Sequence, residues 1–257
     1  MSYISFPTFD THPLKAIQQR INAQRMPSNK TIGILGGLGP QSTSLFYDTI
    51  TRYCLERNLP AFPRLLINSV NTWEVTALLK KKDLEALYFF LKKEISLIAG
   101  QVDSLVMVCN SVHAVLDPLR EAFDIPILSI HEEVCKEIAL SPTKKVGILG
   151  TKTTIDNQFY QKELAAYGIP YVLQPERQLI EFDTCIFDEM LHGKGLGTMR
   201  KLILDGIEYM RERGCDGVIL ACTELPLFVT QTDTDMPLFL STQILAQAVM
   251  EEYFTAF

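Results

Sequence analysis

The sequence predicts an α/β protein built from two similar domains, and three observations support this prediction. Short apolar runs rich in Val, Ile and Leu alternate with amphipathic stretches of helical period. The runs are almost continuously apolar, which is typical of parallel strands buried on both faces. Segments of the first half of the chain also recur in the same order in the second half. Together these features indicate βαβ units in a doubly wound arrangement.

The predicted elements follow from period and from flanking turn residues. The runs predicted as strands are Thr31–Leu35, Arg64–Asn68, Ser104–Val108, Ile125–Ser129, Lys145–Leu149, Pro170–Leu173, Gly217–Ala221 and Pro237–Leu240. The clearest helical stretches are Thr43–Cys54, Asp83–Ala99, His131–Leu140, Ile155–Tyr167, Met199–Arg213 and Thr242–Tyr253.

Three pairs of segments repeat at nearly constant spacing. Gly33–Gly36 recurs at Gly147–Gly150, Asp103–Cys109 recurs at Asp216–Cys222, and Ile125–Ser129 recurs at Met236–Ser241. This duplication predicts two pseudo-symmetric three-layer α/β/α domains, each with a small, mainly parallel sheet. Ligands of such sheets bind beyond the carboxyl ends of the strands, so the active site is expected in the cleft between the domains.

We expect residues 1–30 to form an N-terminal arm. The first domain is predicted to comprise residues 31–126 plus 237–257, and the second residues 127–236. In this division the final strand and helix of the chain cross back to the first domain.

Composition excludes several classes of function. The 257 residues carry a formal net charge of −6, and no basic stripe is present. Nucleic-acid and anionic-membrane partners are therefore not expected. No apolar run approaches the roughly 20 residues of a membrane span, and the N-terminus does not resemble a signal peptide. We therefore expect a cytoplasmic protein.

Cytoplasmic thiols stay reduced, so the six cysteines are expected to be free. No C-x-x-C pair occurs and the chain has only four histidines, so no metal site is expected. The four cysteines without symmetric partners are predicted to be structural: Cys54, Cys135, Cys185 and Cys215.

Cys109 and Cys222 end equivalent strands of the repeat, each at a strand-to-helix turn. A helix N-terminus there favours an anion and can lower the pKa of a thiol. Two thiols on opposite sides of one cleft suit racemisation at a Cα carbon, because one thiolate removes the proton while the other thiol donates one to the opposite face. Cys109 and Cys222 are thus the candidate catalytic residues.

Two turns could stabilise the carbanion of such a reaction through the substrate carboxylate. Gly37 and Gly39 follow the first strand, and their backbone N–H groups could approach an anion. Thr151 and Thr153 occupy the equivalent turn of the second half. The alternative for both loops is a tight turn with a helix cap. The glycine loop is not a dinucleotide fingerprint, because Ser42 and Asn68 stand where a glycine and an acidic residue are expected.

His113 and Glu224 allow more than one interpretation. His113 lies four residues after Cys109 and could form a Cys–His pair of a thiol hydrolase or transferase, tune the thiol or help to bind substrate, or be a polar helix residue near the cleft. Glu224 could orient a thiol or a substrate ammonium group, or only complement a helix N-terminus.

The motifs around both cysteines resemble those of the aspartate/glutamate racemase family. These are Val108-Cys109-Asn110-Ser111-Val112-His113, Ala221-Cys222-Thr223-Glu224-Leu225-Pro226 and the glycine-rich Gly36–Pro40 with Ser42-Thr43. The resemblance extends over residues 31–253. It implies two pseudo-symmetric domains and two-base racemisation without pyridoxal phosphate or metal. It also implies that Asn110, Ser111 and Thr223 hold the substrate, and that the protein is a homodimer.

The chain departs from the family pattern at two places. Aspartate-specific members carry an arginine after the second strand, whereas Asn68–Val75 contains none. A neutral or bulkier side chain is then favoured, because a second carboxylate lacks its usual partner. The family's carboxylate-binding lysine is also displaced: His192 stands near its place and Lys194 follows two residues later.

We therefore predict an isomerase, specifically a cofactor-independent amino-acid racemase or epimerase whose partner is a small amino-acid substrate. The alternatives are an isomerase or decarboxylase of the same scaffold, or a non-catalytic amino-acid-binding protein. The predicted substrate-binding residues are Gly37, Gly39, Asn68, Asn110, Ser111, Thr151, Thr153, Lys194, Thr223 and Glu224.

Overall fold

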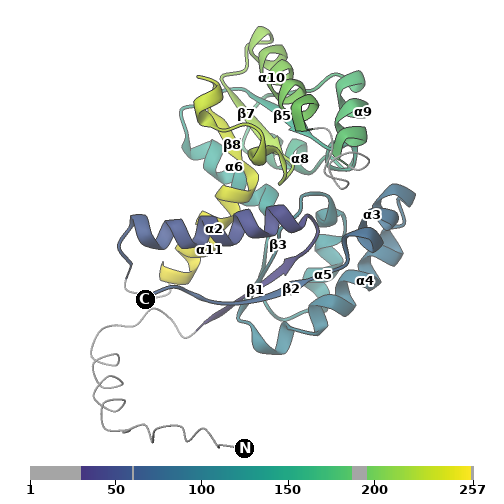
Figure 1. The fold of residues 1–257 in the computed structure, drawn as a ribbon, viewed down its shortest axis with the longest axis vertical. Helices are drawn as coiled ribbons and strands as arrows, with labels where there is room; N and C mark the ends of the chain where they lie inside the picture. Colours follow the sequence, from purple (N-terminus) through teal and green to yellow (C-terminus); the bar gives the residue numbers. More distant parts are fainter. Residues whose placement is uncertain (1–29, 60, 187–195, 256–257) are drawn as a thin grey trace, which may run out of the picture.

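The computed structural model describes residues 30–59, 61–186 and 196–255, which form two lobes (Figure 1). Each lobe contains a four-stranded sheet, in the orders β2-β1-β3-β4 and β6-β5-β7-β8, and every pairing is parallel. The strands are β1 Thr31–Gly36, β2 Arg64–Ser69, β3 Ser104–Met107, β4 Ile127–Leu128, β5 Val146–Gly150, β6 Tyr171–Leu173, β7 Gly217–Ala221 and β8 Leu238–Leu240. The predicted fold class is confirmed: the two sheets have the same order.

Helices cover the sheets. They are α2 Pro40–Glu56, α3 Thr72–Lys81, α4 Leu84–Ser96, α5 Leu116–Ala122, α6 Ile130–Leu140, α7 Lys152–Asp156, α8 Phe159–Ala166, α9 Glu176–Thr184, α10 Leu196–Glu212 and α11 Ser241–Thr255. Short 3-10 helices span Ala99–Gln101, Ser111–Val115, Leu225–Leu227 and Gln231–Asp233. The sequence pattern did not predict α3, α5 or α9, because each is ten residues or shorter and gives little periodic signal.

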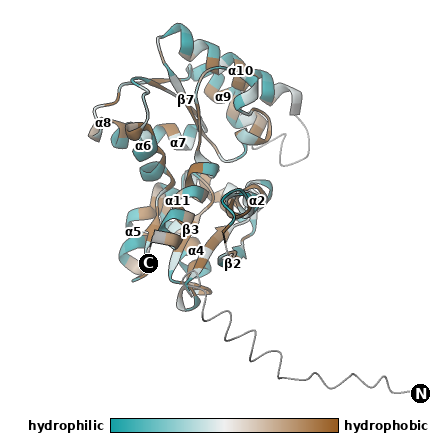
Figure 2. Ribbon diagram, turned by 90° about the vertical axis from the view of Figure 1, so that its left-hand side faces the viewer, coloured by the Kyte–Doolittle hydropathy of each residue, from teal (hydrophilic) through white to brown (hydrophobic). Residues whose placement is uncertain are grey.

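Strands β1, β5 and β7 are buried along their whole length, as expected of central parallel strands. Figure 2 shows hydrophobic residues along the strands, while the helices around them carry both hydrophobic and hydrophilic bands. This amphipathic pattern places one helix face on the core and the other in solvent.

The chain passes between the lobes twice, after β4 and after β8 (Figure 1). Helix α11 packs in the first lobe, where Leu245, Val249 and Met250 join a core cluster with Ile34 and Phe46.

Strand pairing differs slightly from the predicted division. The two residues of β4 belong to the first sheet and β8 belongs to the second, because each strand completes its own sheet before the chain crosses. The domain limits themselves stay a prediction.

The predicted N-terminal arm lies outside the described residues except for Lys30. Within the described ranges, each helix is too short or too polar to span a bilayer.

Candidate active site

A cavity of about 510 Å³ lies at the carboxyl ends of strands from both sheets. Its volume is in the range of small-molecule sites. Residues of both lobes line it: Leu38, Gly39, Pro40, Gln41, Val70, Asn71, Thr72, Trp73, Val75, Thr76, Leu79, Cys109, Asn110, Ser111, Thr151, Ile186, Ala221, Cys222, Thr223 and Glu224. The cavity therefore lies where the carboxyl-end rule for parallel sheets predicts a site.

Cys109 lies two residues beyond the end of β3, immediately before the turn that starts the 3-10 helix Ser111–Val115. Its thiol receives hydrogen bonds from the backbone N–H groups of Ser111 and Val112, which lower its pKa. Desolvation outweighs these bonds and, with the negative charge of Glu224, raises the pKa of Cys109 to about 12. Cys109 is therefore a neutral thiol near pH 7.

Cys222 follows the last residue of β7, which makes it the structural counterpart of Cys109. Its Sγ donates a hydrogen bond to Oε2 of Glu224 at 3.1 Å. Burial, together with the nearby carboxylate, raises the pKa of the Cys222 thiol well above its ordinary value. The expectation that the turns lower both thiol pKa values was thus wrong, because desolvation exceeds the effect of the backbone N–H groups.

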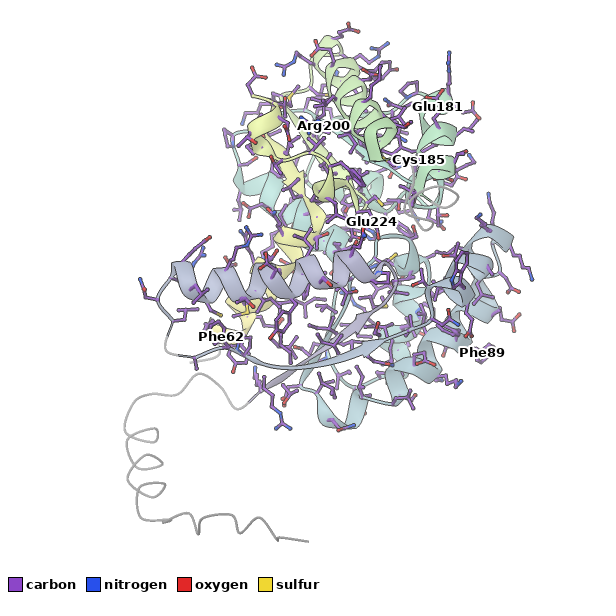
Figure 3. All side chains as sticks on the ribbon, in the orientation of Figure 1. Phe62, Phe89, Glu181, Cys185, Arg200 and Glu224 are labelled. Carbon is purple, nitrogen blue, oxygen red and sulfur yellow. The ribbon has the colours of Figure 1, made fainter. Side chains whose placement is uncertain are left out.

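Glu224 is held by side chains of both lobes, and Figure 3 shows it where the lobes meet. Ser42 Oγ donates to Glu224 Oε1 at 2.8 Å, and Thr223 Oγ1 donates to Oε2 at 3.0 Å. Gly39 packs so closely on this carboxylate that a Cβ there would lie 1.8 Å from Oε1. The glycine thus leaves space for the carboxylate to reach Ser42.

Asn110 lies in a buried network that joins the two strand ends. Its Oδ1 accepts a hydrogen bond from the hydroxyl of Tyr160 at 2.6 Å, and its Nδ2 donates to Ser241 at 3.2 Å. Ser241 in turn donates to the carbonyl of Leu220 on β7. Since Asn110 belongs to the first lobe and Tyr160 to the second, this network fixes the strand ends relative to each other.

Ser111 and Thr151 also meet across the cleft, with their hydroxyl oxygens 3.1 Å apart. Either hydroxyl can be the donor. Both side chains line the cavity, so both can turn to a bound carboxylate.

His113 bonds to backbone groups. Its Nδ1 lies 2.9 Å from the carbonyl of Cys109, and its Nε2 lies 3.3 Å from the backbone nitrogen of Ile130. A proton on Nδ1 satisfies both contacts, because Nε2 then accepts from Ile130. Burial lowers the pKa of His113 to about 4. The imidazole is therefore neutral and connects the turn after β3 to α6, and a Cys–His catalytic pair is not formed.

Three predicted substrate-binding residues lie outside the cavity wall. The N–H of Gly37 donates a hydrogen bond to Thr43 Oγ1. Its φ is +77° and a Cβ would collide with the backbone of Val70, so this position requires glycine. Asn68 donates to the carbonyl and carboxylate of Glu94. Thr153 lies on α7 and does not line the cavity. Their placement does not support substrate contact. Lys194 and His192 lie outside the described residues.

Two residues of the site were not predicted as functional. In the sequence, Ser42 is interpreted as part of a helix start and Tyr160 as part of an amphipathic helix. Their partners, Glu224 and Asn110, lie far along the chain, and no local motif indicates such contacts. No disulfide joins any two of the six cysteines, all of which lie within the described ranges. Across the described ranges, no three His, Cys, Asp or Glu side chains are grouped so that they could hold a metal ion.

Two repeated α/β lobes that share one cavity at their strand ends have the architecture of the Asp/Glu racemases. The chain belongs to the Asp/Glu/hydantoin racemase family, whose model matches residues 35–249. It is 28% identical over 227 residues to the broad specificity amino-acid racemase RacX of Bacillus subtilis, covering 86% of this chain and 97% of that protein.

Solved structures give the same result. An aspartate racemase homologue from Pyrococcus horikoshii is 30% identical with a TM-score of 0.72, covering 87% of this chain and 99% of the other. A putative Asp/Glu racemase from Yersinia pestis is 26% identical with a TM-score of 0.75 and the same coverage. These similarities extend over nearly the whole of both chains, so they include both lobes and the cleft.

Proposed function

We propose that the protein is a cofactor-independent amino-acid racemase that uses Cys109 and Cys222 as its two acid/base groups. One observation carries the proposal: the thiols occupy equivalent strand ends of a repeated fold and line one cavity. Membership of the racemase family supports it, as does the similarity to a relative named as a broad-specificity amino-acid racemase.

In the proposed reaction, the thiolate of one cysteine removes the Cα proton and the thiol of the other donates a proton to the opposite face. The reacting cysteines exchange protonation states, and the reverse reaction restores them. The structure suggests how the first thiolate forms. Cys222 already donates its proton toward Glu224, so this carboxylate is placed to hold the proton when substrate is bound. A substrate ammonium group in the cavity would bring both raised thiol pKa values down again.

The planar carbanion needs stabilisation at the substrate carboxylate. Ser111 and Thr151 are hydroxyl donors on the cavity wall, whereas Thr223 already donates its hydroxyl proton to Glu224. We assign Ser111 and Thr151 to the carboxylate. Asn110 has a different role, since two of its hydrogen bonds already hold the strand ends together. We assign the carboxylate of Glu224 to the Cys222 proton.

The test is exchange of the Cα proton with solvent deuterium, followed by NMR over all common amino acids, with chiral chromatography of the products. We expect exchange and racemisation of at least one amino acid. Cys109→Ser and Cys222→Ser should each reduce racemisation by at least 100-fold. Cys215→Ala is the matched control, because Cys215 is a buried thiol outside the cavity.

The outcomes also separate the alternatives. Turnover that survives the loss of one cysteine would favour an isomerase or decarboxylase that uses a single thiol. Tight binding of an amino acid without any exchange would indicate a binding protein and contradict the proposal. The cytoplasmic location and the homodimer stay predictions, and size-exclusion chromatography with light scattering checks the second.

A further inference from the structure

The cavity has two chemically different sides. The strand ends contribute polar groups, which are Asn110, Ser111, Thr151, Thr223 and Glu224. The lining from α3 and its neighbours is uncharged and largely apolar: Leu38, Val70, Trp73, Val75 and Leu79 are apolar, and Asn71, Thr72 and Thr76 are neutral polar residues. We call the five apolar residues the α3 wall, since Trp73, Val75 and Leu79 lie on α3 and Val70 shortly precedes it, while Leu38 comes from the glycine loop.

The α3 wall is a built surface. Val75 is 2% exposed and Leu79 7% exposed, and both belong to the hydrophobic core that lies behind the wall. Asn71 caps the helix by accepting a hydrogen bond from the backbone N–H of Trp73. The helix is also tied to the glycine loop, because the hydroxyl of Thr72 donates to the carbonyl of Gly37. A side chain placed against this surface meets a fixed apolar face.

The charge on the described cavity wall is acidic only. Among the lining residues that the structure describes, Glu224 is the only Asp, Glu, Lys, Arg or His. A substrate carboxylate on the α3 side would lie on largely apolar, uncharged groups, without a cation from those residues, and would share the cavity with a like charge. An unpaired charge on an apolar surface is strongly disfavoured.

We infer that the α3 wall is the side-chain subsite and that it selects amino acids with uncharged, largely apolar side chains over aspartate and glutamate. The inference rests on the proposed racemase function. The reacting Cα must lie by the thiols, and the ammonium and carboxylate groups face the polar strand ends. The side chain then extends toward the α3 wall. Full burial of a leucine-sized side chain there corresponds to about a 10- to 100-fold gain in kcat/KM.

The first experiment measures kcat/KM for Cα deuterium exchange with L-leucine, L-methionine, L-phenylalanine, L-aspartate and L-glutamate. We expect the three apolar substrates to exceed the two acidic ones by at least tenfold. Fastest exchange with aspartate or glutamate would overturn the subsite and leave the proposed racemase intact. Absence of exchange with every amino acid would instead remove the proposed function.

Calorimetric titration with L-leucine and L-aspartate then tests the subsite by binding alone, and tighter binding of L-aspartate would overturn it.

The second experiment places a cation on the α3 wall. Trp73 lines the cavity and is 58% exposed, so Trp73→Arg adds a guanidinium without burying it in the core. We expect the glutamate-to-leucine ratio of kcat/KM, or of binding constants, to rise at least tenfold. Ala77→Arg is the matched control, because Ala77 is an exposed residue of the same helix that does not line the cavity. Equal ratios in the two variants would exclude the α3 wall as the subsite.

Discussion

The hydroxyl of Ser42 in the first lobe donates a hydrogen bond to the carboxylate of Glu224 in the second lobe, over 2.8 Å. The same carboxylate accepts the proton of the Cys222 thiol. The side chain of Glu224 therefore connects a contact between the lobes to the Cys222 thiol.

Replacing Glu224 by Gln should lower kcat about 10- to 100-fold, the range for losing a charge-assisted hydrogen bond of about 1.5–3 kcal/mol. It should also shift the pH profile. The negative charge of Glu224 raises the pKa of both thiols, and the thiolate is the active base, so kcat/KM rises with pH. Without the charge the rising limb should move to lower pH.

A pH series of kcat/KM measures this shift. Glu208→Gln, on the exposed face of α10, is the matched control and should leave the profile unchanged. A Glu224→Gln profile that coincides with the original would contradict the role given to this carboxylate.

Gly39→Ala should reduce activity through the same carboxylate. The added Cβ would lie 1.8 Å from Glu224 Oε1, so the carboxylate has to leave its bond with Ser42. We expect a fall in kcat of at least tenfold, with the melting temperature changed by only a few degrees. Gly100→Ala is the control, because a Cβ at Gly100 meets nothing within 4 Å. Full activity in Gly39→Ala would show that the carboxylate position is not required.

Tyr160→Phe should destabilise the protein by about 1–3 kcal/mol, because it leaves the buried Oδ1 of Asn110 without this hydrogen bond. Urea unfolding measures the change. The activity should fall as well, since Asn110 lies beside Cys109 and joins the two strand ends. Tyr167→Phe, at a half-exposed position on the second lobe, is the control. A decrease in the free energy of unfolding of less than about 0.5 kcal/mol would mean that water replaces the hydroxyl of Tyr160.

Acid should destabilise the fold through two buried histidines. Burial lowers the pKa of His113 to about 4 and that of His131 well below its ordinary value. Between about pH 6.5 and 4 the unfolded chain binds protons at these positions and the folded protein does not, so stability falls as the pH falls. Each histidine contributes up to about 1.4 kcal/mol per pH unit.

Chemical unfolding at pH 7, 6 and 5 tests this dependence. In His113→Asn the stability should depend less steeply on pH, by the contribution of one histidine. An identical slope in the variant and the original protein would show that His113 is not buried in its neutral form.

The architecture and the cysteine pair could be predicted from the sequence because their signals are local. Apolar runs such as Thr31–Leu35 and Gly217–Ala221 have the composition of central strands, and both are strands. Duplicated segments placed Cys109 and Cys222 at equivalent strand ends, which the structure shows. Helix α3 was not predicted, because a helix of ten residues with one capping asparagine shows too short a periodic hydrophobic pattern to be recognised.

The sequence by itself determined the strands, the repeat and the positions of both thiols, since neighbouring residues define each strand and short segments of the two halves can be compared directly. Only the tertiary structure decided which groups meet across the cleft. Ser42 and Glu224, or Asn110 and Tyr160, are joined by the packing of two lobes, and no local pattern encodes such contacts. The raised thiol pKa values have the same origin, because desolvation depends on everything that surrounds the sulfur atom.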